Sequence, residues 1–174
     1  MKIRAALPDD LPAMLEIVDR AAQAYRGVIP PDCWHEPYMP ETELRQEIAD
    51  GIEFWLAEVA GAPAGMMGIQ DRDEVALVRH AYVSPDVQRV GVGTGLLHHV
   101  EALTTKPILI GTWAAATWAI AFYRRNGYAV VTDTEKNALL RRFWSVPERQ
   151  IETSVVLADR RWVARSSANP GASA

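Results

Sequence analysis

Three long strand-like segments follow one another between residues 52 and 83. Segments 52–59 and 64–70 flank the turn Ala60-Gly61-Ala62-Pro63, which predicts a β-hairpin, and 74–83 continues as a third strand. After residue 90, short apolar strands alternate with helical segments. An antiparallel run followed by strand–helix alternation predicts a mixed sheet of about six to seven strands flanked by helices, in an α/β (α+β) fold.

Helical periodicity predicts the helices that cover this sheet. Apolar residues recur at a spacing of three to four, and capping residues or glycines mark the ends. The predicted helices are 11–25, 41–50, 91–105 and 115–126, and the remaining predicted strands are 2–6, 108–110, 128–132 and 151–158. Residues 26–40 hold four prolines together with Trp34, His35 and Tyr38, which is typical of an ordered loop.

Length and charge limit the classes of protein. The 174 residues suit one domain, which we place at 1–165, and the small polar tail 166–174 is expected to be disordered. With 18 Lys plus Arg against 22 Asp plus Glu, nucleic acid is a poor partner. No membrane-length apolar stretch or signal peptide is visible, so we expect no membrane partner and a cytoplasmic location.

Metal and disulfide chemistry are not expected. Cys33 is the only cysteine, which excludes an intramolecular disulfide and a cysteine-based metal cage. His98 and His99 are adjacent and therefore diverge by about 100° on a helix. We interpret them, with Glu101, as a solvated helix face, and predict no metal site.

A glycine-rich turn joins the third strand to the next helix. Gly91, Gly93 and Gly95 alternate at its end, which removes side chains where backbone N–H groups could converge on a phosphate at the positive end of the helix dipole. A merely tight turn is the alternative. A dinucleotide fingerprint needs glycine where Leu96 stands, and a Walker loop needs a Gly-Lys pair, so neither NAD nor ATP suits this turn.

The turn resembles the acyl-CoA pyrophosphate loop of the GNAT superfamily, whose pattern is Gln/Arg-x-x-Gly-x-Gly/Ala. The matching segment is Gln88-Arg89-Val90-Gly91-Val92-Gly93. A second segment, 119–128, is similar to the family's Ala-x-x-Phe-Tyr-x-x-x-Gly-Phe/Tyr element, and the order of elements over 2–158 also fits. The resemblance implies a GNAT fold and an N-acetyltransferase that moves an acetyl group from acetyl-CoA to a primary amine in a ternary complex.

The resemblance also assigns site residues. It implies that the pantetheine arm binds at the strand end formed by Ala81, Tyr82 and Val83. It implies that the pyrophosphate binds along Gln88, Arg89, Val90, Gly91, Val92, Gly93 and Thr94. Tyr123 stands where relatives carry the general acid, with a packed tyrosine beside Phe122 as the structural alternative. Arg125 is expected to reach a phosphate of the cofactor, or to be an ordinary surface arginine.

The chemistry requires a base, because an amine attacks a thioester only when deprotonated. Relatives often carry Glu or His where this chain has Leu77 and Arg79, so the resemblance supplies no base. His80 is the nearest substitute, although strand alternation turns it to the face opposite Arg79. A core histidine is the alternative for His80, and Glu74 is expected to be solvated.

Other sources of the base stay open, as does one cofactor contact. A water chain, His35 or Glu36 could accept the proton. Ala116 stands where many relatives have an asparagine that contacts pantetheine, so that contact is missing or supplied elsewhere.

Arg79 suggests a hypothesis about the acceptor. By alternation it shares a face with Ala81, and a guanidinium cannot act as a base but suits a carboxylate or phosphate. An amine that also carries an anion would then be the acceptor. The equal alternative is an ion pair with an internal acid such as Glu74, Asp71 or Glu36.

A non-catalytic acyl-CoA binding or sensing module is the rival hypothesis, and Tyr123 favours the enzyme because binding alone needs no proton donor there. The acceptor is a small-molecule or peptide amine that the sequence does not identify. Six tryptophans, including Trp144 and Trp162, allow an apolar surface for a second copy, so a homodimer stays open.

Overall fold

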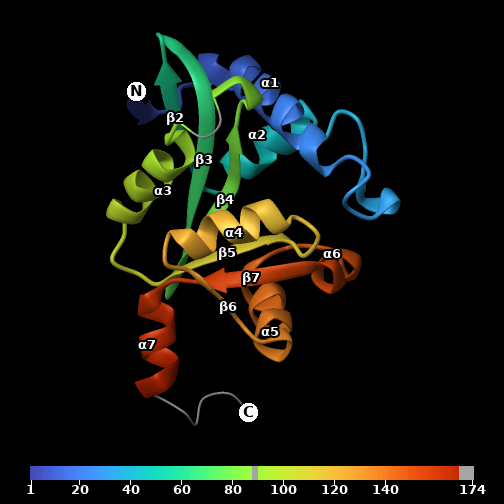
Figure 1. The fold of residues 1–174 in the computed structure, drawn as a ribbon, viewed down its shortest axis with the longest axis vertical. Coiled ribbons are helices and arrows are strands. Elements are labelled where there is room, and N and C mark those ends of the chain that lie inside the picture. The colour runs from blue at the N-terminus through green and yellow to red at the C-terminus, as the bar shows by residue number, and fades with distance from the viewer. Residues whose placement is uncertain (88–89, 169–174) are drawn as a thin grey trace. The chain divides into compact units, whose positions relative to one another are not determined.

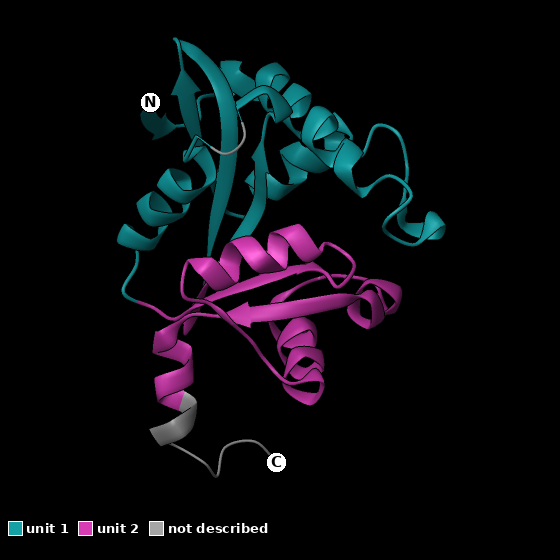
Figure 2. Ribbon diagram, viewed as in Figure 1, with its two compact units in different colours: residues 1–71, 78–105 teal, residues 72–77, 106–174 magenta. Residues whose placement is uncertain are grey.

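The computed structural model describes residues 1–87 and 90–168. Seven strands form one sheet in the order β1-β2-β3-β4-β5-β7-β6 (Figure 1). The chain divides into two compact units, shown in Figure 2: unit 1 comprises residues 1–71 and 78–105, and unit 2 comprises 72–77 and 106–174. The α/β fold with a mixed sheet of about seven strands is thereby confirmed.

Unit 1 is built on the hairpin that the sequence predicts. Its elements are β1 (Lys2–Ala5), α1 (Leu11–Ala22), α2 (Glu41–Ala49), β2 (Ile52–Val59), β3 (Ala62–Arg72), the later part of β4 (Val75–Val83) and α3 (Val92–Ala102). Short 3-10 turns add η1 (Pro8–Asp10), η2 (Gln23–Tyr25), η3 (Pro31–Cys33) and η4 (Pro85–Val87). Strand β2 pairs antiparallel with both β1 and β3.

The two faces of β2 carry different helices. Ile52, Phe54 and Leu56 pack into a buried cluster with apolar side chains of α1 and α2. Trp55 points the other way, and its ring centroid lies 4.2 Å from that of His99 on α3. Strand alternation therefore places α1 and α2 on one side of unit 1 and α3 on the other (Figure 1).

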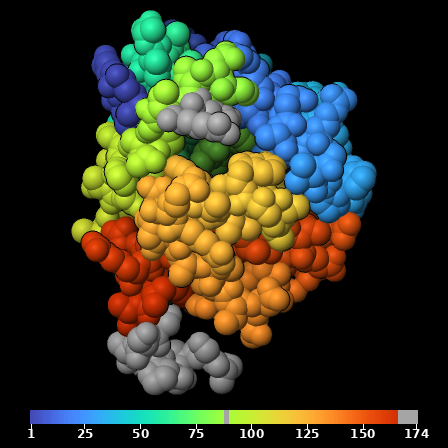
Figure 3. Space-filling model, viewed as in Figure 1, coloured from blue at the N-terminus to red at the C-terminus, as the bar shows by residue number. Residues whose placement is uncertain are grey.

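Unit 2 is organised around β7, which pairs antiparallel with both β5 and β6. Its elements are β5 (Ile108–Trp113), α4 (Thr117–Arg125), β6 (Ala129–Val130), α5 (Asp133–Phe143), α6 (Glu148–Thr153), β7 (Ser154–Ala158) and α7 (Arg160–Ala168). Apolar side chains of β5, β7, α5 and α6 share one buried cluster. Helix α4 lies in front of β5 in Figure 1, and the yellow and orange part of the chain forms most of the visible surface of this unit (Figure 3).

Several predicted boundaries differ from the structure. The helix predicted to reach residue 25 ends at Ala22 and continues as η2, and the strand predicted from 151 begins at Ser154 because α6 occupies the preceding residues. Helices α5 and α7 were not predicted. Thr132 and Glu135 match the Ser/Thr-x-x-Glu pattern of a helix start. This pattern could have predicted the start of α5, but helical periodicity alone did not.

The structure differs from the prediction at the C-terminus. Helix α7 continues to Ala168, past the residue at which the disordered tail is predicted to begin, and the rest of that tail lies outside the described residues. The single domain at 1–165 stays a prediction.

Trp144 is 8% exposed, and Trp162 is half-buried with its Nε1 donating to Glu135. These two tryptophans therefore contribute little of the apolar surface expected for a second copy. No helix in the described ranges is both long and apolar enough to cross a membrane.

Candidate functional site

The N-terminus of α3 is formed by a glycine in the left-handed region. Gly91 is the N-cap with φ of +87°, and a Cβ placed on it would meet no atom of the described residues within 4 Å. The first turn contains no acidic residue. The backbone N–H groups of a helix start have no intrahelical acceptors, so this end of α3 is suited to an anion.

The predicted loop residues differ in environment. Val90 is 69% exposed, Val92 is buried, and Gly93 and Thr94 are half-buried. Gln88 and Arg89 lie outside the described residues. The phosphate-binding assignment of this loop stays a prediction.

Gly95 lies beside the N-terminal segment of the chain. A Cβ on it would overlap Cε of Met1, the end of a flexible side chain. The expectation that this third glycine serves a phosphate stays a prediction.

The end of β4 holds the residues predicted to bind pantetheine. Ala81, Tyr82 and Val83 are half-buried, and Tyr82 packs against the apolar cluster of α1 and α2. The backbone N–H of Ser84 donates to Ala64 O at 2.8 Å, which holds the end of β4 beside β3. The predicted pantetheine contacts are not tested by this geometry.

Strand alternation breaks at His80, which has φ of +52°. Arg79 Nη2 donates to both carboxylate oxygens of Glu47 at 2.9 Å, and His80 Nε2 lies 3.2 Å from Glu47 Oε2. The prediction that these two side chains lie on opposite faces is therefore wrong. A left-handed residue rotates the strand locally, so both side chains reach the same carboxylate on α2.

Gly68 on β3 allows this distorted segment to pack. A Cβ there would lie 3.1 Å from Arg79 O and 2.6 Å from Cγ2 of Ile52. A side chain at this position would force Ile52 to shift and would crowd the backbone at Arg79, so glycine favours this close approach.

Glu47, Arg79 and His80 form a cluster, which we call the Glu47 cluster. Their side chains are 19%, 15% and 13% exposed. Burial alone raises the pKa of Glu47, but the close contact with His80 and its charge, followed by the charge and hydrogen bonds of Arg79, outweigh it and leave that pKa below its usual value. Glu47 is therefore a carboxylate at neutral pH.

The cluster is extended by Gln70 and Phe54. Arg79 Nη1 donates to Gln70 Oε1 at 3.2 Å, and Gln70 Nε2 donates to Asp50 O at 2.9 Å. The ring of Phe54 lies 5.9 Å from that of His80. Arg79 and His80 are thus held from three sides by elements of unit 1.

These contacts favour the ion-pair alternative for Arg79, with an acid that the sequence analysis did not name. The guanidinium is engaged by Glu47 and Gln70, whereas Glu74 pairs with Arg142 and Arg165 in unit 2. The expectation that Glu74 is solvated is therefore wrong. An anion-binding role of Arg79 toward the acceptor stays a prediction.

The two other candidate bases lie in the loop 26–40. His35 is exposed and stacks on Tyr38 with ring centroids 6.0 Å apart. Glu36 is exposed, and its Oε1 lies 3.4 Å from Nη1 of Arg26. Neither belongs to the Glu47 cluster.

Tyr123 lies on α4 in unit 2 and is 6% exposed. Its ring centroid is 5.0 Å from that of Phe122 and 6.1 Å from that of Tyr128, in edge-on arrangements. These contacts fix the ring and are compatible with both the general acid and the packed tyrosine, so the catalytic assignment stays a prediction.

The remaining residues of the second motif occupy the ends of α4. Ala116 is the fully buried N-cap, and its carbonyl accepts from the N–H groups of Ala119 and Ile120. Arg125 is exposed in the last turn.

The two adjacent histidines on α3 are not equivalent. His98 is exposed, but His99 is half-buried against Trp55. The solvated-face interpretation is therefore wrong for His99. Within the described part of the chain, no group of three or more His, Cys, Asp or Glu could hold a metal ion.

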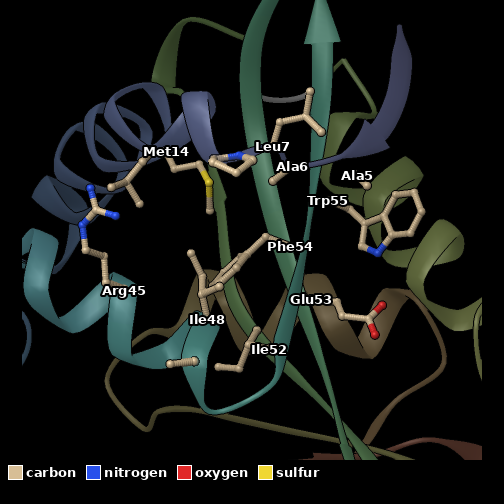
Figure 4. Close-up of a pocket in the computed structure, with 13 residues that line it drawn as sticks. Ala5, Ala6, Leu7, Met14, Arg45, Ile48, Ile52, Glu53, Phe54 and Trp55 are labelled. Atoms are coloured by element: carbon tan, nitrogen blue, oxygen red, sulfur yellow. The ribbon is translucent and has the colours of Figure 1, made fainter.

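An apolar cavity of about 540 Å³ lies in unit 1 beside β1 and β2. Figure 4 shows Met14, Ile48 and Phe54 around it, with Arg45 on one side and Glu53 on the other. None of the residues predicted for catalysis or cofactor binding lines this cavity.

Sequence reasoning missed Glu47, although one signal was present. Leu44 is buried on α2, and Glu47 follows it by three residues, which places it on the buried stripe of that helix. A carboxylate at such a position is unusual and needs a partner. Its partners, Arg79 and His80, are far away in sequence and could not be paired with it from spacing.

Comparison with solved structures supports the fold. An N-acetyltransferase PaiA from Thermoplasma acidophilum, in complex with coenzyme A, aligns with a TM-score of 0.70 and 17% identity over 91% of this chain and 97% of that one. A GNAT-family acetyltransferase from Staphylococcus aureus Mu50 aligns with a TM-score of 0.68 and 17% identity over 91% and 97%. The ribosomal-protein-S18-alanine N-acetyltransferase from Escherichia coli aligns with 0.64 and 20% over 91% and 92%.

Comparison with protein families identifies the class of enzyme. A search among curated proteins found no match. The family model of the acetyltransferase (GNAT) domain matches residues 18–142, which is well over half of the chain. Members of this family use acetyl-CoA and an amine acceptor. The chain therefore belongs to the GNAT family of N-acetyltransferases.

Proposed function

We propose that this chain transfers an acetyl group from acetyl-CoA to a primary amine by direct attack in a ternary complex. The observation that carries the proposal is the start of α3, where Gly91 forms a left-handed cap whose Cβ position is clear of the described residues, with no acid in the first turn. A pyrophosphate is the ligand that such a helix start suits in this family. The similar PaiA enzyme is in complex with coenzyme A, which supports the same choice.

The chain's own residues would hold acetyl-CoA, which supplies the thioester. The pyrophosphate would bind along residues 88–94, chiefly through backbone N–H groups, and the pantetheine along residues 81–83. Arg125 is exposed and would reach a phosphate. Because backbone groups dominate, side-chain substitutions in the loop should matter less than changes to its glycines.

Proton transfer would involve His80 and Tyr123. The acceptor arrives as an ammonium, so His80 accepts one proton and frees the nitrogen lone pair. The Tyr123 hydroxyl donates its proton to the departing sulfur and recovers one from the new amide nitrogen. The balance is one ammonium and one thioester converted to one amide, one thiol and one proton, which leaves from His80.

Ligand binding tests the cofactor assignment. Titration calorimetry and thermal unfolding with acetyl-CoA should show binding and a rise in Tm, because a ligand of the native state stabilises it by mass action. NAD and ATP at the same concentration are the controls and should give neither. No heat and no stabilisation with millimolar acetyl-CoA would contradict the proposal.

Activity tests the enzyme against the sensing module. A panel of amines and amino acids should include a compound that releases free thiol from acetyl-CoA, and Tyr123→Phe should lower kcat on it by roughly 10²- to 10⁴-fold. The affinity for acetyl-CoA should change little. Tyr128→Phe is the matched control, since its ring packs edge-on against Tyr123. Equal kcat of Tyr123→Phe and the unmodified protein would remove the acid role.

A further inference from the structure

We infer that Glu47 is a positioning residue for the base: it holds the His80 ring and keeps the proton of the neutral ring on Nε2, so that Nδ1 carries the lone pair. The inference rests on the proposed function, in which His80 accepts the ammonium proton. Glu47 acts through His80 and is not itself given a proton to accept.

The first support is a set of contacts that fixes the carboxylate. Both oxygens of Glu47 accept from Arg79 Nη2 at 2.9 Å, and Arg79 is itself held by Gln70. Glu47 Oε2 then lies 3.2 Å from His80 Nε2. A carboxylate only accepts hydrogen bonds, so the nitrogen that faces it is the one that carries hydrogen.

The second support is the unusual backbone that makes the contact. His80 has φ of +52°, a conformation that a residue other than glycine adopts only when the surrounding structure compensates its cost. That rotation brings Arg79 and His80 to one carboxylate, and Gly68 leaves room for it. A regular strand would separate the two side chains.

The electrostatics agree with the geometry. The charged groups that face His80 are Glu47 from α2 and Arg79 from its own strand, with Phe54 of β2 against the ring. The interaction with His80 is one of the causes that lower the pKa of Glu47.

The Nε2 atom is not yet in a well-formed hydrogen bond. It is buried and lies within contact distance of Glu47, but its direction falls short of hydrogen-bond geometry. Catalytic hydrogen bonds are often long or poorly aligned before substrate binds. Alignment on binding is therefore part of the inference.

The test compares Glu47→Gln with Glu47→Asp and His80→Gln, with Glu43→Gln on the exposed side of α2 as the matched control. We expect Glu47→Gln to lower kcat by roughly 10- to 100-fold, a fraction of a full general-base contribution, with the KM for acetyl-CoA within about twofold. Its kcat/KM should be lowered across the acidic limb of the pH profile, because the carboxylate that holds the His80 ring is gone. His80→Gln should abolish that limb, and Glu43→Gln should match the unmodified protein.

A second readout does not need activity. The ¹⁵N shifts of the His80 ring distinguish the two neutral tautomers, and His80→Gln assigns the signals among the four histidines. The unmodified protein should show hydrogen on Nε2. Glu47→Gln should give a mixture, because an amide can bind the ring through its oxygen or its NH₂. If Glu47→Gln does not fold, Glu47→Asp, which keeps the charge but shortens the side chain, should still show the altered ring signals.

The outcomes separate the two proposals. If His80→Gln abolishes the acidic limb while Glu47→Gln leaves both the limb and the ring signals unchanged, the inference is overturned and the proposed base stands. If His80→Gln retains the limb, the base assignment itself is wrong. If no amine is acetylated, the proposed function fails, and the ring signals still decide whether Glu47 sets the tautomer.

Discussion

Helices α3 and α5 have the same length but begin in opposite ways. The N-cap of α5 is Thr132, whose Oγ1 accepts from the N–H of Glu135, and Asp133 and Glu135 place negative charge in the first turn. The N-cap of α3 is Gly91, with no capping side chain and no acid. The residues of α5 thus cap its positive end and place negative charge there, whereas the N-cap and first turn of α3 supply neither.

The largest effect should come from straining the cap of α3. In Gly91→Ala, the Cβ disfavours a φ of +87° by about 1 to 2 kcal/mol, so the loop shifts and acetyl-CoA binding should weaken by roughly 10-fold. Titration calorimetry measures the change in Kd.

Gly51→Ala is the matched control for that substitution. Gly51 follows α2 with φ of +88°, and a Cβ there would also meet no atom within 4 Å. Both variants should lose similar stability, but only Gly91→Ala should lose affinity. An equal Kd for the two variants would show that the left-handed cap has no part in binding.

A carboxylate placed directly before α3 should give its start the negative charge that the first turn of α5 carries. Val90 is exposed, and Val90→Asp adds a carboxylate that competes with a pyrophosphate for the helix start. We expect the Kd for acetyl-CoA to rise by about fivefold at low salt, the equivalent of roughly 1 kcal/mol, and the effect to shrink as salt rises.

Val90→Asn isolates the charge, because it has the same shape as aspartate and is neutral. It should bind acetyl-CoA almost as well as the unmodified protein at every salt concentration. The same loss in Val90→Asn and Val90→Asp would contradict the electrostatic explanation.

Removing the cap of α5 should affect stability alone. Thr132→Ala leaves the N–H of Glu135 without its side-chain acceptor, which typically costs about 1 kcal/mol in the free energy of unfolding. Urea denaturation measures that loss, and Thr134→Ala, an exposed position in the same helix, is the control. A lower affinity of Thr132→Ala for acetyl-CoA would contradict the prediction that the cap of α5 affects stability alone.

The last contrast concerns η1, where the Asp10 carboxylate accepts a hydrogen bond from the backbone N–H of the N-cap, Leu7. The hydrogen bond from Arg4 lowers the pKa of Asp10 to about 2; burial opposes this shift, while the Leu7 N–H and the Arg4 charge add to it. A folded pKa below the unfolded value means that this stabilisation is present above about pH 4 and is lost as pH falls toward 2.

Denaturation from pH 7 to pH 2 tests this sign. Asp10→Asn should be less stable than the unmodified protein at neutral pH, and the difference should shrink as pH approaches 2. Asp9→Asn, at an exposed neighbouring position, should show no such convergence. A constant difference at all pH values would contradict the linkage.

Local patterns in the sequence predict the sheet, the hairpin and the glycine turn because each depends on residues close to one another. Strand alternation and helical spacing are short-range, and the loop motif places Gly91 directly before a helix. The resemblance to the family also depends on short motifs, at residues 88–93 and 119–128. The short helix α6 was missed, because six residues make fewer than two turns and show too little periodicity to detect.

The Glu47 cluster was decided by the tertiary structure alone. Strand alternation is an average property, and the left-handed backbone at His80 overrides it because Gly68 leaves room for Arg79 O. Packing of α2 against β2 then sets the depth of Glu47, which no local spacing reports. The sequence by itself therefore determined the fold and the glycine turn before α3 through short-range patterns, whereas the contact among Glu47, Arg79 and His80 required α2 and β4, which are distant in sequence, to pack together.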